Sequence, residues 1–495
     1  MEQEAQASRG RLGTLLHNTA ALSVGRLGSK ILVFLLVRFY TGVLTDAQYG
    51  TADLITNLAN LLIPLACAGL SSGFFRFVAE ARNKKERKVV LNTGLLLLLI
   101  TSLIFLCLSP LLLLWHYFST YVLLIIAYVL CANLHYFCTE YIRGLGMYHL
   151  FAWQGLLNTA LNIALNLIFL LPLNLGVTGY VLSILLADLF SSVFVIVRAK
   201  LWRVIALRRA DMSLLRDMLR FCLPLIPASV CWWIISVSDR YMVAYFCGDA
   251  ANGLYTAAYK IPNLLTICGT VFVEAWQFSA VVENRTQDDE EDEDVLLARK
   301  KRVTRFFTQV FGGYSALLML GGGCMIVCAQ LLAHILFDQS FFAAWVYIPV
   351  LLGATVFSAL SSFVSSVYLV EKKAQLSLLT TAIGALINLV FNFLLIPAMG
   401  AMGAAVATLI AYFALLLIRL LNAGHYIPFS WQPTRLGINT VLLVLLALSL
   451  SLQWSFPFLV VPFFFLLVLN NVGPLWRSVI SLWKLKKGKK TQKIS

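Results

Sequence analysis

The chain has 495 residues, of which 60% are hydrophobic and only 12% are charged. Soluble proteins carry about 25% charged residues, so this composition and a mean hydropathy of +0.84 exclude an ordinary water-soluble protein. The net charge of +15 does not indicate nucleic-acid binding, because the basic residues cluster in short loops between apolar segments. We therefore expect an all-α polytopic membrane protein.

Apolar segments long enough to cross a bilayer follow one another along almost the whole chain. A hydrocarbon layer about 30 Å thick needs about 20 apolar residues of helix, since every backbone polar group must be satisfied within the helix. The first segment is too long for a signal-peptide core and no small-residue cleavage site follows it, so we expect it to be retained. The sequence predicts about fourteen transmembrane helices, at residues 18–40, 50–77, 89–114, 120–142, 151–171, 176–197, 219–243, 254–282, 306–332, 341–370, 375–396, 401–421, 436–453 and 457–473.

The loops between these segments alternate in charge. Every second loop, such as 41–49 and 109–120, contains no Lys or Arg. Because Lys and Arg are enriched in cytoplasmic loops, this alternation predicts that both termini are cytoplasmic. The basic clusters that define the inner side are Arg82–Lys88, Arg198–Arg220, Arg299–Arg305, Lys372 with Lys373, Arg419 with Arg435, and the tail from Arg477 to Lys493.

An internal repeat divides the chain into halves. The stretch "DAQYGTADLITNLANLL" from Asp46 matches "DAANGLYTAAYKIPNLL" from Asp249, with Asp, Gly and Asn each recurring 203 positions later. A second match joins the stretch from Asn162 to the stretch from Asn388, in the fifth and eleventh predicted helices. Both matches join helices six apart, so the halves enter the membrane from the same side. This predicts two parallel, pseudo-symmetric six-helix lobes facing a cleft, plus two extra C-terminal helices.

The predicted domain organisation follows from these segments. Ten cysteines are scattered through apolar spans, and neither a disulfide nor a metal site is predicted from them. The predicted parts are a cytoplasmic N-terminus at 1–17, an N-lobe at 18–198, a cytoplasmic linker at 199–218, a C-lobe at 219–421, two further helices within 435–473 and a basic cytoplasmic tail at 474–495.

Cationic side chains inside the predicted helices are candidates for substrate binding, because a charge in the bilayer is costly unless it faces water or protein. Arg26 and Lys30 share a face of the first predicted helix, since they are four residues apart. Lys260 lies near the outer end of the eighth, beside Pro262. Together they would form a cationic cavity wall that binds a phosphate-bearing or other anionic substrate. Snorkelling or internal ion pairing is the alternative interpretation.

Acidic side chains inside the predicted helices are candidates for coupling to a proton or sodium gradient, or for structural interior carboxylates. These acids are Asp53, Glu140, Asp188 and Glu274. His135, five residues before Glu140, is a further candidate for a proton relay. Asp239 and Arg240 close the seventh predicted helix, where they would either pin the outer helix ends or take part in gating. No catalytic residue, metal ligand or cofactor is predicted.

Polar side chains also occur near the predicted lobe openings. Hydroxyls and amides match the hydrogen bonding of a polyol, so these residues would suit a sugar path, and they would equally suit hydrogen bonds between helices. They are Tyr49, Asn57, Asn60, Tyr255, Tyr259 and Asn263.

Three motifs carry a resemblance to a known family: "LTDAQYGTADL", "SDRYMVAYFCGDAANGLYTAAYKIPNLL" and "INLVFNFLLIPAMGAMGAAVATLIAY". They resemble the bacterial polysaccharide-exporter branch of the multidrug/oligosaccharidyl-lipid/polysaccharide exporter superfamily, over nearly the whole chain. The resemblance implies a fourteen-helix flippase of the bacterial cell membrane that carries an undecaprenyl-diphosphate-linked oligosaccharide from the inner to the outer leaflet by alternating access. Arg26, Lys30 and Lys260 would supply the cationic cavity common in relatives. Membrane lipids and other polysaccharide assembly proteins are the expected partners.

Several alternatives stay open. A flippase for the peptidoglycan lipid precursor would share the fold and the cationic cavity. A cation-coupled multidrug antiporter usually stops at twelve helices, whereas this sequence predicts two more. A membrane glycosyltransferase or polymerase would need catalytic carboxylates or an extended outer site. The outer loops are short and their only acids are Asp46, Asp249 and Asp338, so we do not expect an enzyme.

Overall fold

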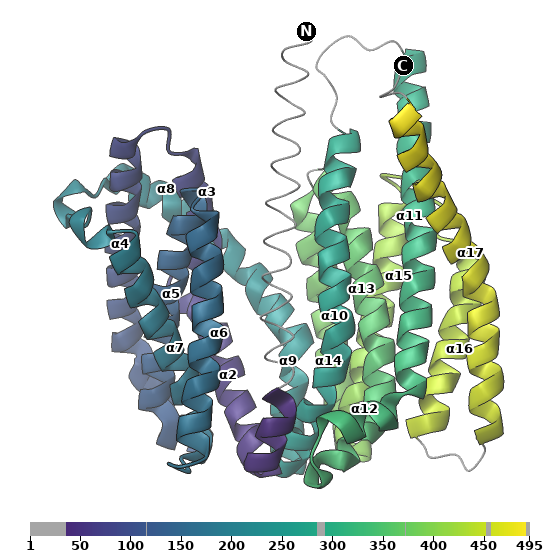
Figure 1. Cartoon of the computed structure of the whole chain (residues 1–495), viewed down its shortest axis with the longest axis horizontal. Helices are drawn as coiled ribbons and strands as arrows, with labels where there is room; N and C mark the ends of the chain where they lie inside the picture. The colour runs from purple at the N-terminus through teal and green to yellow at the C-terminus, as the bar shows by residue number, and fades with distance from the viewer. Residues whose placement is uncertain (1–35, 115, 285–292, 372, 452–456, 492–495) are drawn as a thin grey trace. The chain divides into compact units, whose positions relative to one another are not determined.

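The structure is a computed structural model that describes residues 36–114, 116–284, 293–371, 373–451 and 457–491 (Figure 1). Within these ranges the regular structure is entirely helical, and no strand occurs. Among the described residues, ten helices are long and apolar enough to cross a membrane, and the bent pair α2 and α3 makes eleven if it is one span. The all-α polytopic membrane fold predicted from hydropathy is therefore confirmed.

Three of the fourteen predicted spans are not among these eleven. The first, 18–40, falls mostly outside the described residues, of which 36–43 are helical. The eighth coincides with α10, Asp249–Asn284, which carries Lys260 within its apolar sequence. The fourteenth coincides with α17, Pro457–Thr491, whose apolar stretch Val460–Trp476 is shorter.

The helices form two compact units, Met1–Trp233 and Ile234–Ser495. The boundary falls inside α9, whereas the sequence places the lobe boundary in the linker 199–218; the predicted lobe bounds themselves stay a prediction. The helices of the first unit are α2 Asp46–Ala66, α3 Leu70–Glu80, α4 Lys84–Leu108, α5 Val122–Gly144, α6 Tyr148–Leu170, α7 Gly176–Arg198 and α8 Met212–Cys222. Helix α9, Ile226–Cys247, continues from the first unit into the second.

The second unit contains the remaining helices. Besides the end of α9 they are α10 Asp249–Asn284, α11 Glu293–Val327, α12 Ala329–Leu336, α13 Ile348–Val370, α14 Ala374–Met399, α15 Ala401–Ala423, α16 Pro433–Ser451 and α17 Pro457–Thr491. Helix α13 is central to this unit, since it packs against α10, α11, α14, α15 and α16.

The bend between α2 and α3 shows how local sequence sets the shape of a span. Helix α2 begins at a capping box, in which Thr45 and Gln48 satisfy each other's backbone amides. It ends before Gly69, whose φ of +74° favours glycine, and α3 departs at 47°. A Cβ at Gly69 would lie 2.4 Å from the carbonyl oxygen of Cys222, so the bend also lets the end of α8 approach closely.

The same packing occurs in both units. Helix α7 packs against α5 and α6 in the first unit, and α15 packs against α13 and α14 in the second. In α6 the Asn166 amide donates to Asn162, and in α14 the Asn392 amide donates to Asn388. This agreement follows the internal repeat predicted from the sequence.

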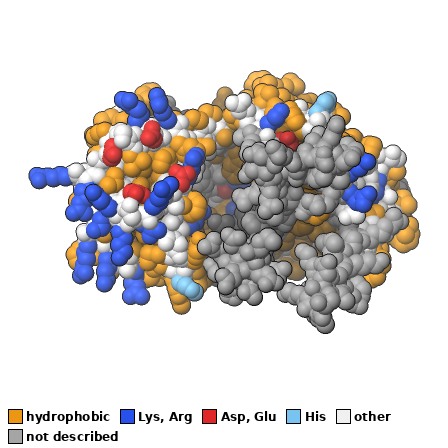
Figure 2. Space-filling view, turned by 90° about the horizontal axis from the view of Figure 1, so that it is seen from above, with side chains coloured by type: hydrophobic (Ala, Val, Ile, Leu, Met, Phe, Trp, Pro, Cys, Tyr) orange, Lys and Arg blue, Asp and Glu red, His pale blue; other side chains and the backbone are white. Residues whose placement is uncertain are grey.

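The basic clusters of the first unit lie at one end of it. The linker after α7 is tied to the start of α4, where the Asn92 side chain donates to the Val204 carbonyl and accepts from the Ala206 amide. This brings the exposed basic residues of the α3–α4 turn and of the linker together, and Figure 2 shows Lys and Arg side chains gathered on this end of the unit. Both clusters thus lie on one side, as the predicted topology requires. Which side of the membrane it is stays a prediction.

Candidate functional site

The predicted cationic wall lies only partly within the described residues. Arg26 and Lys30 fall in the range 1–35, outside them. Lys260 lies on α10 with a partly buried side chain, and the side chain of Glu274 further along α10 is outside the described part. A cavity shared by Arg26, Lys30 and Lys260 therefore stays a prediction.

Asp188 belongs to a polar cluster inside the first unit. Nδ1 of His135 on α5 lies 2.9 Å from Oδ1 of Asp188 on α7. The amide of Asn158 on α6 donates to the same carboxylate oxygen at 2.8 Å. The Gln154 amide contacts Nε2 of His135, and Gln154 is only 4% exposed. A carboxylate and an imidazole are thus in direct contact, with polar neighbours from α6, and a role of this cluster in coupling stays a prediction.

The other two candidate coupling acids of the first unit have different neighbours. Glu140 forms an ion pair with Arg143 on the same helix, and the Arg143 guanidinium lies 4.3 Å from the ring centre of Phe75. Asp53 on α2 accepts a hydrogen bond from the Asn57 amide at 2.8 Å. His135 is thus paired with Asp188, whereas the sequence suggested a relay with Glu140.

Asp239 is fully buried in the second unit. Its carboxylate accepts hydrogen bonds from the hydroxyls of Tyr255 and Tyr259, each at 2.8 Å, and from Thr408 at 3.3 Å. The Arg240 backbone amide donates to its other oxygen, and the Arg240 guanidinium lies 4.7 Å from the ring centre of Tyr259. Donors from α10 and α15 thus hold α9 at Asp239, eight residues before its last residue Cys247, an arrangement that favours a structural role over gating. A gating role stays a prediction.

Arg419 does not lie in an inner loop, where the charge pattern placed it. It is 6% exposed within α15. Its Nε donates to Thr380 at 3.2 Å and its Nη2 to Thr381 at 2.8 Å, both on α14. Its Nη1 donates to the carbonyl and the hydroxyl of Ser361 on α13, both at 3.1 Å. The guanidinium therefore joins three helices through neutral oxygens.

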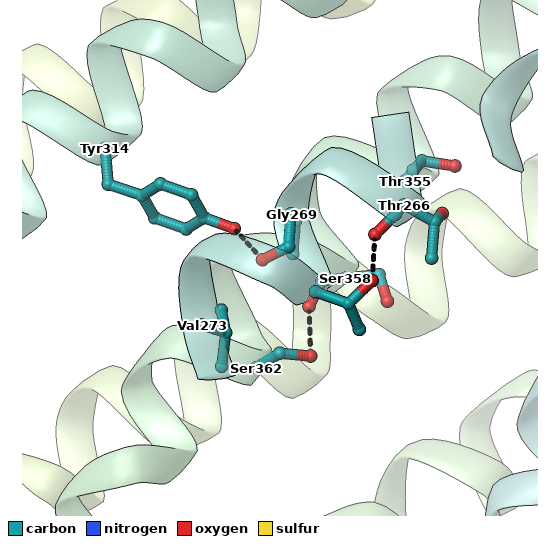
Figure 3. Close-up of a pocket in the computed structure, with 9 residues that line it drawn as sticks. Thr266, Gly269, Val273, Tyr314, Thr355, Ser358 and Ser362 are labelled. Atoms are coloured by element: carbon teal, nitrogen blue, oxygen red, sulfur yellow. Dashed lines mark hydrogen bonds between the residues drawn. The ribbon is translucent and has the colours of Figure 1, made fainter. Parts of the chain in front are cut away.

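A pocket lies between α10, α11 and α13 of the second unit (Figure 3). Its cavity volume is about 70 Å³. None of the nine described residues that line it is charged, and six carry hydroxyl groups. The lining residues are Thr266, Gly269, Thr270, Val273, Tyr314, Thr355, Ser358, Ala359 and Ser362.

A family model described as polysaccharide biosynthesis protein matches residues 15–276, more than half of the chain. The chain belongs to this family. No curated protein sequence matches the chain significantly. The match to the polysaccharide biosynthesis family confirms the resemblance inferred from the motifs.

Solved structures show the fold of this polysaccharide biosynthesis family member. The lipid II flippase MurJ in an inward closed conformation matches at 13% identity and a TM-score of 0.65, over 94% of this chain and 99% of that one. An inward-facing multidrug resistance MATE family transporter of the MOP superfamily matches at 19% identity and a TM-score of 0.62, over 82% of this chain and 98% of that one. A MOP superfamily transporter from Pyrococcus furiosus matches at 16% identity and a TM-score of 0.55, over 83% and 95%.

Sequence reasoning missed several of these polar groups. The His135–Asp188 contact joins residues 53 positions apart, and no local pattern marks it. The hydroxyls of the pocket had a weak signal, because Thr355, Ser358 and Ser362 recur at helical spacing along one face of α13. Arg419 lies inside the long apolar run 401–421, a signal that could have identified it as an intramembrane charge.

Proposed function

We propose that this chain is a flippase that carries an undecaprenyl-diphosphate-linked oligosaccharide from the inner to the outer leaflet of a bacterial cell membrane by alternating access. One observation carries the proposal: a chain of the polysaccharide biosynthesis family has a transporter fold, shared with a lipid II flippase over 94% of its length. A lipid-linked glycan precursor is the molecule that such a family would need to move across a membrane. The chain is in this proposal a transporter and not an enzyme.

Recognition of the diphosphate is assigned to the cations of the predicted cavity. Arg26, Lys30 and Lys260 would hold the phosphates, since a guanidinium gives paired hydrogen bonds and an ammonium gives a compact charge. The basic end of the first unit would face the cytoplasm, where the lipid-linked substrate is made.

A proton gradient is the energy source in this proposal, and the polar cluster of the first unit supports it. Imidazole suits proton exchange near neutral pH, and His135 contacts Asp188 directly. Asp188→Asn keeps the shape of the side chain but removes its charge, so we expect export to stop while expression is normal. Asp217→Asn, on the exposed face of α8, is the matched control and should export normally. Coupling to sodium would instead make export depend on external sodium at constant pH.

The central experiment is a deletion of the gene in its host. We expect loss of a surface polysaccharide and accumulation of its lipid-linked repeat unit in the inner leaflet. Complementation with the wild-type chain should reverse both effects. Unchanged surface glycans with no accumulated intermediate would contradict the proposal.

A second candidate function is flipping of the peptidoglycan lipid precursor, which the fold match to a lipid II flippase favours. It predicts that the chain rescues a strain that lacks its own precursor flippase. Rescue of growth without any change in surface polysaccharide would replace the first proposal by the second. A multidrug antiporter is less favoured, because the MATE structure covers only 82% of the chain.

A further inference from the structure

The described lining of the pocket between α10, α11 and α13 includes none of the residues of the predicted cationic wall or of the His135–Asp188 pair. Its walls come from within one unit, and six of its nine described lining residues carry a hydroxyl. Figure 3 shows these side chains approaching one another from neighbouring helices. Lining of this kind points to a ligand with many hydroxyls of its own.

The hydrogen bonds that the lining hydroxyls already form determine whether they can act as donors or as acceptors toward such a ligand. Thr270 donates its proton to the Thr266 carbonyl at 2.6 Å, and Ser362 donates to the Ser358 carbonyl at 2.9 Å. Because each hydroxyl gives its proton to its own helix, its lone pairs stay available as acceptors. The pocket therefore presents acceptors to any hydroxyl group that enters it.

Tyr314 adds a donor. Its hydroxyl lies 3.5 Å from the Gly269 carbonyl, which is long for an O–H···O bond, whose usual length is about 2.7–2.8 Å. The ring is held by Phe272, stacked at 4.3 Å between centroids. A ligand hydroxyl would therefore meet a fixed phenol whose proton is weakly engaged.

The size and charge of the pocket limit the ligand further. Its cavity volume of about 70 Å³ is well below that of pockets that enclose a whole ligand, which span roughly 300–1,000 Å³. The pocket therefore admits the hydroxyl-bearing edge of one sugar ring through its open side, and not an oligosaccharide. Because none of the described lining residues is charged, they offer no counter-ion for a phosphate or a carboxylate.

The open side of the pocket is also polar. Thr266 and Thr270 on α10 and Ser362 on α13 are exposed, and Asn263 continues the row along α10. In contrast, α14 exposes Leu386 and Phe393 at more than 60% of their surface, as expected where lipid is the solvent. The pocket thus opens on a face suited to water.

We propose that this pocket binds one neutral sugar ring of the transported glycan, through acceptors from Thr270 and Ser362 and a donor from Tyr314. The inference rests on the proposed function for the identity of the cargo. The binding of a neutral pyranose can nevertheless be measured without transport.

The test uses the full-length protein in lipid nanodiscs and saturation-transfer NMR with methyl glucoside, methyl galactoside, N-acetylglucosamine and methyl glucuronide. We expect at least one neutral probe to bind and the glucuronide to bind less well. The double variant Thr270→Val with Ser362→Ala should weaken binding about tenfold, because two hydrogen bonds are lost. Ser365→Ala, one turn further along α13 and outside the lining, is the matched control and should bind normally.

A second variant keeps the test valid if the double variant fails to fold. Gly269→Ala would place a Cβ 3.1 Å from the Tyr314 hydroxyl and 3.5 Å from Ala359, so it narrows the pocket without removing a polar group. It should also weaken binding. No saturation transfer from any neutral probe, or transfer unchanged in both variants, would overturn the proposal. If binding persists while gene deletion leaves surface glycans unaltered, the pocket stands and the proposed function fails.

Discussion

Replacement of Arg419 by Met tests whether a buried guanidinium stabilises the second unit. The side chain makes four hydrogen bonds, to Ser361, Thr380 and Thr381. Hydrogen bonds between membrane helices contribute about 0.6 kcal/mol each on average, so the loss of four predicts about 2 kcal/mol of destabilisation. The Thr380 and Thr381 hydroxyls stay satisfied, since both also donate to their own helix. These two hydroxyls therefore add no large penalty for stranded polar groups.

The assay is reversible unfolding of the purified protein in mixed micelles, followed by tryptophan fluorescence. Leu421→Met, at a position of α15 that is 63% exposed, is the matched control for introducing methionine and should be neutral. Arg419→Lys should recover only part of the stability, because an ammonium cannot reach both neighbouring helices as a planar fork does. If Arg419→Met were as stable as the wild type or more so, desolvation of the charge would outweigh its hydrogen bonds, and our reasoning would be wrong.

Three further predictions concern separate parts of the chain. Arg26→Ala combined with Lys30→Ala should abolish export of surface polymer while the protein still inserts; normal export would remove the cationic-cavity hypothesis. Gly69→Ala should destabilise the first unit by about 1–3 kcal/mol, since it adds a Cβ at a positive φ, whereas Gly155→Ala meets open space and should not destabilise it in the same unfolding assay. Hydrogen bonds from the Ser213 hydroxyl and from the Ser213 and Leu214 backbone amides lower the pKa of the Asp211 carboxyl below its usual value. The cap it forms on α8 should therefore hold at neutral pH and weaken as pH falls through that lowered pKa, seen as faster amide exchange in α8 that an Asn variant does not show.

The membrane fold could be predicted from the sequence because hydrophobic length is a local property. A helix that crosses a bilayer needs its apolar residues in one run, so the spans at 176–197 and 401–421 coincide with α7 and α15 within two residues. The internal repeat was equally visible, since both copies keep the Asn pairs that hydrogen-bond within α6 and α14.

The polar groups of the interior could be predicted only as residues and not as pairs. Asp188 was recognised as an intramembrane acid, but its contact with His135 depends on how α5 packs against α7. Arg419 was assigned to a loop because charge was counted by position along the chain, whereas hydroxyls on α13 and α14 let it stay buried. The pocket hydroxyls were missed because single Ser and Thr residues are common in apolar helices.

The chain passes between its two compact units inside an unbroken helix. Within α9, the Trp233 indole donates to the Asn57 carbonyl in the first unit at 2.8 Å. Two residues later, Ile235 packs against Ala385 and Leu415 in the second. Two residues less than one helical turn apart thus contact different units, and the chain between them is continuous helix. In the alternating access proposed above, a change between the two states would therefore have to bend or rotate α9, so a proline or a glycine pair inserted there should change the rate of export and leave substrate affinity intact.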